Sequence, residues 1–353
     1  MRHGVLALIF VMALAGSAAA DEIRVPQDKP TIQAAIDDAA AEDVVVVSRG
    51  VYEENVSMES RTGITIEGRG GVVIRPTGTG LFIHACRDIT VTGIAVKGGT
   101  IGIDVFESND VTIQKVAVSG TTAEGVRADD STDIRLLDSR IRGTGADGVL
   151  FINLTSCQVS GVKVSNSASD GIEAKGINVV VTDCKVSNVG DDCFESDGTL
   201  GPVRFENCKA SHAKSDGFDI GAPGTVVIGC SAKKCQDDGF DVEGAGSHLE
   251  NCVAKGSRDR GYGVDDTNGI ELVSCSAVGN GGQGFELMNV DNSTVEGCTA
   301  KKSGEEGFSL GGTSSGVTLT GNTASKSATF DLSDSSEGPN TFMDNEFKSI
   351  STN

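Results

Sequence analysis

The sequence predicts an all-β fold, a parallel β-helix in which the chain winds into stacked turns, here called rungs. The main observation is a position, usually glycine, that recurs at intervals of 22 to 24 residues. A repeat this short cannot hold a crossover helix, so its strands pair with the equivalent strands of the next repeat. Two further observations are strand-like alternation inside each repeat and a helical segment ahead of the first one. The recurring positions are Gly80, Gly102, Gly125, Gly148, Gly171, Cys193, Gly217, Gly239, Gly261, Gly284, Gly307 and Thr329.

The first twenty residues have the features of a secretory signal peptide. Arg2 supplies a positive charge, a short apolar run follows, and Ala18 and Ala20 form a small-residue cleavage site. The apolar run is too short to span a bilayer. We therefore expect residues 1–20 to be removed and one β-helix domain, residues 21–353, to be exported to the periplasm, the cell surface or the medium.

The chain is strongly acidic, with 29 basic and 50 acidic residues and a formal net charge of −21. Such a surface repels nucleic acids and anionic membranes. No apolar stretch after the leader is long enough to cross a bilayer. The expectation is a monomer with no nucleic acid partner and no membrane span.

Residues 31–39 are expected to form a helix that covers the open N-terminal end of the β-helix. Thr31 can act as the N-cap, and Ile32, Ala35 and Ile36 fall on one helical face. Without such a cap, the core and the edge of the first rung would be exposed. The segment "VVVV" that follows begins the sheet.

Each repeat then carries an apolar, acidic, apolar triplet, which is typical of a strand with one face toward the core. The first apolar position is aromatic in the later repeats, and the residue between the two apolar positions is mostly acidic. The aromatic column is Phe194, Phe218, Phe240, Tyr262, Phe285, Phe308 and Phe330. The acidic column is Glu173, Glu195, Asp219, Asp241, Glu286 and Asp331.

A second strand in each repeat contributes a column of six cysteines. We interpret them as small buried residues, because they replace valine at an inward position and lack the C-x-x-C spacing of zinc sites. A metal array and disulfides between rungs remain the alternatives. The column is Cys184, Cys208, Cys230, Cys252, Cys275 and Cys298, and one bond could form among Cys86, Cys157, Cys193 and Cys235, which lie outside it.

Aspartate also forms a column, at the position before the recurring glycine. Because burying unpaired carboxylates in the core is costly, the glycine is expected to bend the chain and present this row on an outer edge. Neighbours about 4.8 Å apart repel by about 1 kcal/mol in water, which a raised pKa or a bound cation would relieve. The row is Asp147, Asp170, Asp192, Asp216 and Asp238, continued by Arg260, Gln283 and Glu306.

Two interpretations of the acidic rows stay open. "Asp-Gly" is good turn chemistry, repeated because the rung is repeated. Alternatively, the rows bind calcium, which accepts six to eight oxygen ligands. The candidate calcium ligands are Asp192, Glu195, Asp216, Asp219, Asp238 and Asp241.

The segments "IRVPQDKPTIQAAIDDAA", "VVVVSRGVYEENV" and "ITIEGRG" resemble the opening of the pectin-lyase-like superfamily of secreted, right-handed parallel β-helices. The resemblance implies a single right-handed solenoid. It does not imply one activity, because the superfamily includes lyases, hydrolases, epimerases, esterases and non-catalytic surface proteins.

Within that superfamily, "GDDC" after "SDGIE" is similar to the polygalacturonase-type hydrolases. Asp170, Asp191 and Asp192 match their acids, and with Asp216 they are the candidate catalytic residues. The family's Gly-His-Gly is replaced by "SDG", and its Arg-Ile-Lys is absent. A polygalacturonase is therefore not expected, although paired carboxylates suit glycoside hydrolysis.

Four basic residues near the acidic rows are candidate substrate-binding residues: His212, Lys214, Arg258 and Arg260. Arg260 could instead pair with Asp238 and end the repulsive row. The sequence thus predicts a secreted protein that acts on or binds polysaccharide, including uronic-acid polymers, through an acidic, calcium-loaded edge. Such an enzyme would be a polysaccharide lyase or a glycoside hydrolase. The alternative is a non-catalytic surface, adhesion or structural solenoid, and whether the chain is an enzyme stays open.

Overall fold

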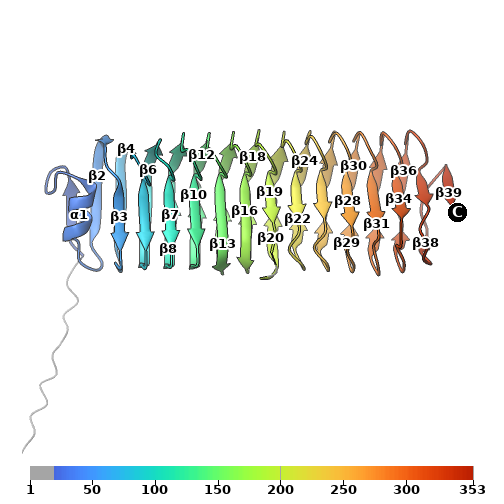
Figure 1. The fold of residues 1–353 in the computed structure, drawn as a ribbon, viewed down its shortest axis with the longest axis horizontal. Coiled ribbons are helices and arrows are strands. Elements are labelled where there is room, and N and C mark those ends of the chain that lie inside the picture. Colours follow the sequence, from blue (N-terminus) through green and yellow to red (C-terminus); the bar gives the residue numbers. More distant parts are fainter. Residues whose placement is uncertain (1–19, 199, 353) are drawn as a thin grey trace, which may run out of the picture.

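A computed structural model describes residues 20–198 and 200–352. It is a right-handed parallel β-helix, drawn out into a rod with one helix at its N-terminal end (Figure 1). The predicted signal peptide falls almost entirely on residues 1–19, which lie outside the described residues. The domain boundary at residue 21 stays a prediction.

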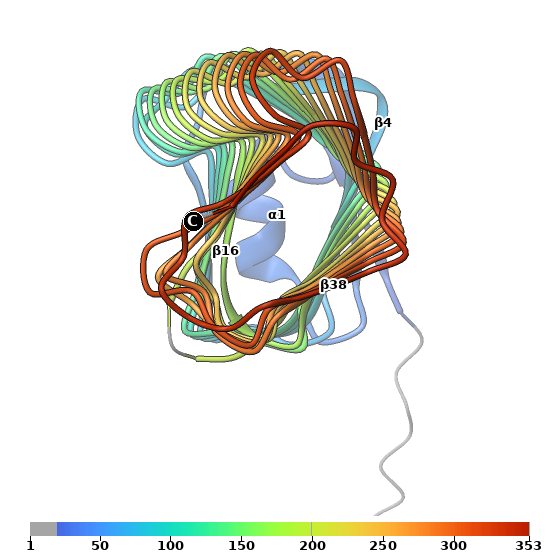
Figure 2. The same ribbon diagram turned by 90° about the vertical axis from the view of Figure 1, so that its right-hand side faces the viewer.

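Three columns of parallel strands form the walls of the rod, and we call them faces 1, 2 and 3 (Figure 2). Face 1 consists of β3 (Val56–Glu59), β5 (Leu81–His84), β7 (Ile103–Phe106), β10 (Val126–Asp129), β13 (Val149–Thr155), β16 (Ile172–Ile177), β19 (Phe194–Ser196), β22 (Phe218–Ile220), β25 (Phe240–Val242), β28 (Tyr262–Asp265), β31 (Phe285–Met288), β34 (Phe308–Gly311), β37 (Leu332–Asp334) and β39 (Ile350–Thr352).

Face 2 begins with longer strands, whose C-terminal halves also supply the first strands of face 3. It consists of β1 (Glu22–Val25), β2 (Val44–Tyr52), β4 (Thr65–Ile74), β6 (Arg87–Lys97), β8 (Asn109–Gln114), β11 (Thr132–Leu137), β14 (Gln158–Ser160), β17 (Val179–Thr182), β20 (Val203–Glu206), β23 (Val226–Ile228), β26 (His248–Glu250), β29 (Glu271–Val273), β32 (Thr294–Glu296), β35 (Thr318–Thr320) and β38 (Thr341–Met343).

Face 3 continues in ten strands of three residues each, whose middle residue points into the core. They are β9 (Ala117–Ser119), β12 (Arg140–Arg142), β15 (Lys163–Ser165), β18 (Lys185–Ser187), β21 (Lys209–Ser211), β24 (Ser231–Lys233), β27 (Val253–Lys255), β30 (Ser276–Val278), β33 (Thr299–Lys301) and β36 (Thr323–Ser325).

Equivalent residues of successive rungs pair with each other. On face 1, for example, Phe218 pairs with Phe240 and Asp219 pairs with Asp241. Because parallel strands lie about 4.8 Å apart, each column of the repeat becomes a stack of like side chains. The predicted alternation is confirmed on β22 and β25, where the two apolar residues are buried and the acidic residue between them is partly exposed. β19 has the same burial pattern, with Ser196 at the second buried position.

The predicted N-terminal cap is α1 (Ile32–Asp38), which lies across the end of the rod in Figure 2. Thr31 is its N-cap, and its hydroxyl accepts a hydrogen bond from the Ala34 amide at 3.1 Å. Ile32 and Ile36 are buried against the first rung. The helix thus covers apolar surface that no further rung would cover.

The aromatic column fills much of the core behind face 1. Six rings, from Phe194 to Phe308, stack face to face with centroids 4.6 to 4.8 Å apart and ring planes within 8° of parallel. Tyr262 is one of these six rings and is fully buried, as its column position predicts.

The last member of this column was predicted wrongly. Phe308 pairs with Leu332, so Asp331 takes the place of the recurring glycine, and Thr329 does not. Phe330 is 39% exposed and lies outside the stack, and Asp331 is not in the acidic column. The turn before this rung is two residues longer than the glycine spacing suggested, and Phe347 covers Phe308 instead.

All ten cysteines are buried and unbonded, so no disulfide forms in the described part of the chain. The six-membered column packs in the core as predicted, and the Cys230 sulfur accepts a hydrogen bond from the Cys208 amide at 3.4 Å. Burial raises the pKa of Cys157 to about 11 and that of Cys235 to about 12. These thiols are therefore protonated and unreactive at neutral pH. Among the described residues, no helix is long and apolar enough to cross a bilayer.

The stack predicts which phenylalanines stabilise the fold. Phe240→Ala should lower the free energy of unfolding by about 3–5 kcal/mol, because it opens a cavity between two stacked rings. Phe330→Ala is the matched control and should cost at most about 0.5 kcal/mol, because that ring is outside the core. Urea denaturation measures both, and equal losses would contradict the register described above.

Candidate functional site

The outer side of face 1 carries two adjacent columns of carboxylates, which we call the acidic strip. One column precedes the recurring glycine, and the other projects from the middle of the strands. The strip consists of Asp147, Asp170, Asp192, Asp216, Asp238, Glu173, Glu195, Asp219 and Asp241.

The recurring glycine places the aspartate column at this site. A Cβ atom on Gly217 would lie 2.4 Å from the Ala232 Cβ and 3.2 Å from the Cys235 sulfur, both in the core. Position 217 therefore faces the core at a point with no room for a side chain. The neighbouring Asp216 is directed to the other side of the chain, where the charges of Asp192, Asp238 and Asp241 act on it.

The aspartate column is turned away from the core, as expected, but the expectation that this would leave it unburied is wrong: its members are only 2–8% exposed. The reason is a hydrogen-bond ladder along the rod. The Oδ1 atom of each aspartate accepts the backbone N–H of the equivalent residue on the next rung, which offsets part of the cost of desolvation. The N···O distances are 3.0 Å from Asp170 to Asp147, 2.8 Å from Asp192 to Asp170, 2.6 Å from Asp216 to Asp192, 2.6 Å from Asp238 to Asp216 and 2.7 Å from Arg260 to Asp238.

The ladder does not fully compensate burial, and the pKa values of seven carboxyl groups of the strip rise toward neutrality. Burial, with the charges of neighbouring carboxylates, raises the pKa of Asp170 to about 7 and that of Asp216 to about 8. On the strand column, burial followed by the charge of Glu173 raises the pKa of Glu195 to about 8. Burial is also the largest cause of four further shifts. It raises the pKa values of Asp192 and Asp241 to about 6 and those of Asp219 and Asp238 to about 7. Several of these groups therefore exchange protons near pH 7.

A lysine lies beside the first two carboxylates of the strand column. The ammonium group of Lys175 contacts Glu173 and lies 3.5 Å from both Glu195 and Asp197. Burial by itself lowers the pKa of Lys175, but the hydrogen bond to Glu173 and the surrounding carboxylates raise it above the ordinary value. Lys175 therefore stays charged and neutralises part of the strip.

On the C-terminal side, Arg260 binds Asp238 at 2.7 Å, Asp265 at 2.6 Å and Glu286 at 3.1 Å. The alternative that it pairs with Asp238 and ends the row is confirmed. Gly263 makes this possible, because a Cβ there would lie 2.4 Å from the guanidinium carbon. Gly263 occupies the acidic column, between Asp241 and Glu286, and sequence reasoning missed it although the break in the column is visible.

The structure brings three of the four candidate catalytic residues together. Asp170, Asp191 and Asp192 each offer an oxygen within 4.8 Å of the others, with Asp191 exposed and the other two buried. Asp216 belongs to a second such group, with Asp237 and Asp238.

Asp237 was not singled out from the sequence. Its signal was the doubled aspartate in "QDDGF", which repeats the "GDDC" pattern two rungs earlier.

The predicted calcium ligands are brought together only in part. Asp216 and Asp238 share a group, Asp192 belongs to another, and Glu195, Asp219 and Asp241 belong to none of the compact groups found among the described residues. The Asp241 Oδ1 atom is buried without a hydrogen-bond partner, 3.9 Å from Arg260. Carboxylate oxygens, one of them unpartnered, are a donor set that fits a hard divalent cation.

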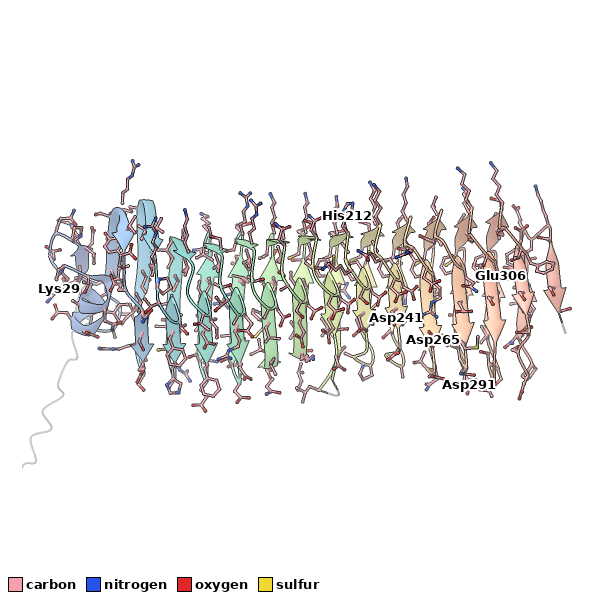
Figure 3. All side chains as sticks on the ribbon, turned by 45° about the horizontal axis from the view of Figure 1, so that its top comes forward. Lys29, His212, Asp241, Asp265, Asp291 and Glu306 are labelled. Carbon is pink, nitrogen blue, oxygen red and sulfur yellow. The ribbon has the colours of Figure 1, made fainter. Side chains whose placement is uncertain are left out.

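The remaining basic candidates lie apart from the strip. His212 and Lys214 are exposed and line a shallow hollow with Gly190 and Gln236 on the turn between faces 3 and 1. Figure 3 shows His212 near one edge of the rod and Asp241 nearer its middle. Arg258 is exposed on a neighbouring turn. These residues can contact a ligand that extends beyond the strip, but none of them forms an ion pair with it.

Comparison with known proteins identifies the family. Residues 47–180 and 170–324 match a family model described as a right handed beta helix region, so most of the chain is covered. The chain belongs to the right-handed β-helix family. No curated protein sequence matches.

Solved structures of this β-helix shape are similar to the chain at low sequence identity. An alginate lyase from Paenibacillus sp. strain FPU-7 is 16% identical, with a TM-score of 0.56, over 66% of this chain and 94% of the lyase. The catalytic domain of a GH87 alpha-1,3-glucanase in complex with tetrasaccharides is 14% identical, with a TM-score of 0.61, over 94% and 70%. The A-module of the Azotobacter vinelandii mannuronan C-5 epimerase AlgE4 is 17% identical, with a TM-score of 0.56, over 95% and 94%. Likeness at this level establishes the fold, which is shared by several activities.

The raised pKa values predict an unusual pH dependence of stability. Seven carboxyl groups of the strip titrate near pH 6–8 in the folded β-helix and near about pH 4 when unfolded. Between those values the folded state binds more protons, so the free energy of unfolding falls as the pH rises. In EDTA, the melting temperature should be at least about 5 °C lower at pH 8.5 than at pH 5.5. The double variant Asp216→Asn/Asp219→Asn should flatten the profile, and a melting temperature that rises with pH would contradict it.

Arg260 should be the most important cation of the strip. Arg260→Gln should lower the free energy of unfolding at pH 8 by about 3–5 kcal/mol, because it leaves several part-buried carboxylates without a counter-charge. The loss should shrink at pH 5, where Asp238, with its pKa raised to about 7 by burial, is protonated. Arg204→Gln removes a partly exposed pair with Glu206 and should cost no more than about 1 kcal/mol. An equal effect of the two changes in urea denaturation would refute this role.

Proposed function

We propose that this β-helix acts on polysaccharide along the acidic strip, as a hydrolase or lyase of the exported type. The observation that carries the proposal is the group formed by Asp170, Asp191 and Asp192, two buried acids with pKa values of about 7 and about 6 beside an exposed one. Cleavage of a glycosidic link needs one carboxyl that donates a proton and another that stays ionised. Environments that separate the pKa values of neighbouring acids support such a division of roles.

Asp170 suits the proton donor. Its Oδ1 atom accepts the Asp192 amide, and its Oδ2 atom lies 3.0 Å from the Ser169 hydroxyl. These contacts hold the carboxyl in one orientation, while burial and the charges of Asp147 and Asp192 keep it partly protonated at pH 7. Exposed Asp191 is the partner that water or a sugar hydroxyl can reach.

The open position of the strip on the side of a long rod suits a polymer. The solved structures that share this fold include an alginate lyase, an alpha-1,3-glucanase and a mannuronan epimerase. This likeness supports a polysaccharide as the substrate class. The replacement of Gly-His-Gly by Ser215-Asp216-Gly217 argues against polygalacturonase chemistry. Lys175 and Arg260 are the cations nearest the acids, and both are already held by carboxylates.

Calcium is the cation that the strip would hold. Asp170, Asp191 and Asp192, or Asp216 with its neighbours, would supply oxygen ligands, and the bound ion would neutralise the carboxylate of a uronic acid. A proton and a calcium ion relieve the same repulsion, so the two should compete.

The activity is tested by reducing-end release from a panel of neutral and uronic polysaccharides at pH 7. The assay contains ~1 mM calcium, which is at or above the dissociation constant of a typical extracellular calcium site. Release from one substrate is expected, and Asp170→Asn and Asp192→Asn should each reduce it at least about 100-fold. Asp183→Asn is the matched control, because Asp183 is exposed on a turn away from the strip and should leave release unchanged. A flat panel would favour the non-catalytic solenoid, and full activity in both strip variants would show that the acidic strip is not the active site.

The calcium site is tested by melting the protein at pH 8 with and without calcium. A concentration of 100 times the dissociation constant should stabilise the fold by about 2.7 kcal/mol, and the gain should be smaller at pH 5, where protons occupy the carboxyls. Asp191→Asn should reduce the gain and Asp183→Asn should not. No shift in the melting temperature at pH 8 would rule out calcium.

A further inference from the structure

The outward positions of face 3 are rich in basic residues and free of acidic ones on its ten short strands. The first and third residues of its ten short strands point outward, and none of these twenty positions carries a carboxylate, although the chain has 50 acidic residues. Eight of the twenty are basic, all of them exposed. They are Arg140, Arg142, Lys163, Lys185, Lys209, Lys233, Lys255 and Lys301.

Four of these side chains stack directly on one another, and we call them the basic ladder. Arg140 pairs with Lys163, Lys163 with Lys185, and Lys185 with Lys209, on four consecutive rungs. None of the four forms an ion pair or a side-chain hydrogen bond within the described residues. Nitrogen-tipped side chains project along one long edge of the rod in Figure 3.

The ladder does not stabilise the fold by itself. Like charges about 4.8 Å apart repel by about 1 kcal/mol in water, and directly opposed like charges weaken strand pairing. Asp138 and Asp183 line hollows beside the ladder, on the preceding turn, but neither lies within ion-pair distance of it. A stack of four unpaired cations in a protein of net charge −21 is therefore better explained by an external anion.

Hydroxyl groups accompany the cations. Ser165, Ser187 and Ser211 follow Lys163, Lys185 and Lys209 two residues later and point outward on the same strands. They stack in register with one another. A row of cations beside a row of hydroxyls offers partners both for carboxylate or sulfate groups and for sugar hydroxyls.

We propose that the basic ladder and its serines bind an acidic polysaccharide lengthwise along face 3. The basic ladder with its serines is three residues wide, about 10 Å. This width suits a single polysaccharide chain and is narrow for a nucleic acid duplex. None of the twenty outward positions is aromatic, so the stacking that single-stranded nucleic acids use has no platform here. This binding face is separate from the acidic strip on face 1, and the inference does not rest on the proposed activity.

The test measures binding of polygalacturonate oligomers by calorimetry at low salt, with dextran as the neutral polymer. Wild type should bind polygalacturonate, more weakly as sodium chloride is raised, and should not bind dextran. Lys163→Ser/Lys185→Ser/Lys209→Ser should weaken binding at least about tenfold, since each lost contact removes one ionic interaction. Serine fits this column, because Ser231 occupies the same position on the next rung.

The matched control, Arg49→Ser/Arg87→Ser/Lys348→Ser, removes the same charge from exposed positions off face 3 and should bind as wild type does. The titrations are run in EDTA, which withholds the calcium that the acidic strip would need and so separates binding at this face from binding at the strip. A melting curve checks that the ladder variant is folded. If it is not, glutamine at the same three positions is the second variant.

Three results would overturn the proposal. They are no binding by wild type, equal weakening in the control and ladder variants, and tighter binding of single-stranded DNA than of polygalacturonate of equal charge.

Discussion

The in-register pairing of each rung with the next is the constraint on which the rest of this structure depends. Backbone N–H groups of one rung donate to carbonyls of the next, as from Phe218 to Gly239 and from Phe240 to Gly261. Every position of the repeat is thereby placed directly over its equivalent. A favourable contact between two equivalent side chains is therefore repeated on every rung of a column and stabilises the fold each time. A repulsion between equivalent side chains is repeated in the same way and destabilises it.

The two kinds of charged column meet this constraint differently. On face 1 the aspartates are buried, and each accepts the amide N–H of the next rung, with Lys175 and Arg260 at either side. Their remaining repulsion appears as raised pKa values, which is the property that general acid chemistry uses. On face 3 the basic ladder extends into solvent, where water screens the charges and an external polyanion can reach them. A net charge of −21 thus conceals two faces of opposite sign.

The core shows the same rule for apolar residues. A Cβ on Gly171 would lie 2.1 Å from Val186, so the recurring position must be glycine where the facing column is valine. One rung later the facing residue is Ala210, and Cys193 takes the glycine's place. From that rung onward the phenylalanine stack begins, so volume lost on one wall is replaced on another and the packing stays dense.

Much of the fold could be predicted from the sequence alone. The period, the alternation, the cap at Thr31 and the phenylalanine and cysteine columns are local or repeated patterns, and repetition makes their meaning unambiguous. The exception was the last rung, where a longer turn moved Phe330 out of the column. One irregular repeat leaves no pattern against which its register can be checked.

The acidic strip was only half visible in the sequence. Its aspartates could be named, but their burial depends on amide groups of the next rung, 22 to 24 residues away. The place of Arg260 over Gly263 and the grouping of Asp216 with Asp237 are likewise contacts between rungs or across a turn. The sequence by itself determined which residues share a column. Only the tertiary structure decided which side of the wall each column occupies and what lies beside it, because hydrogen bonding and exposure are set by neighbouring rungs.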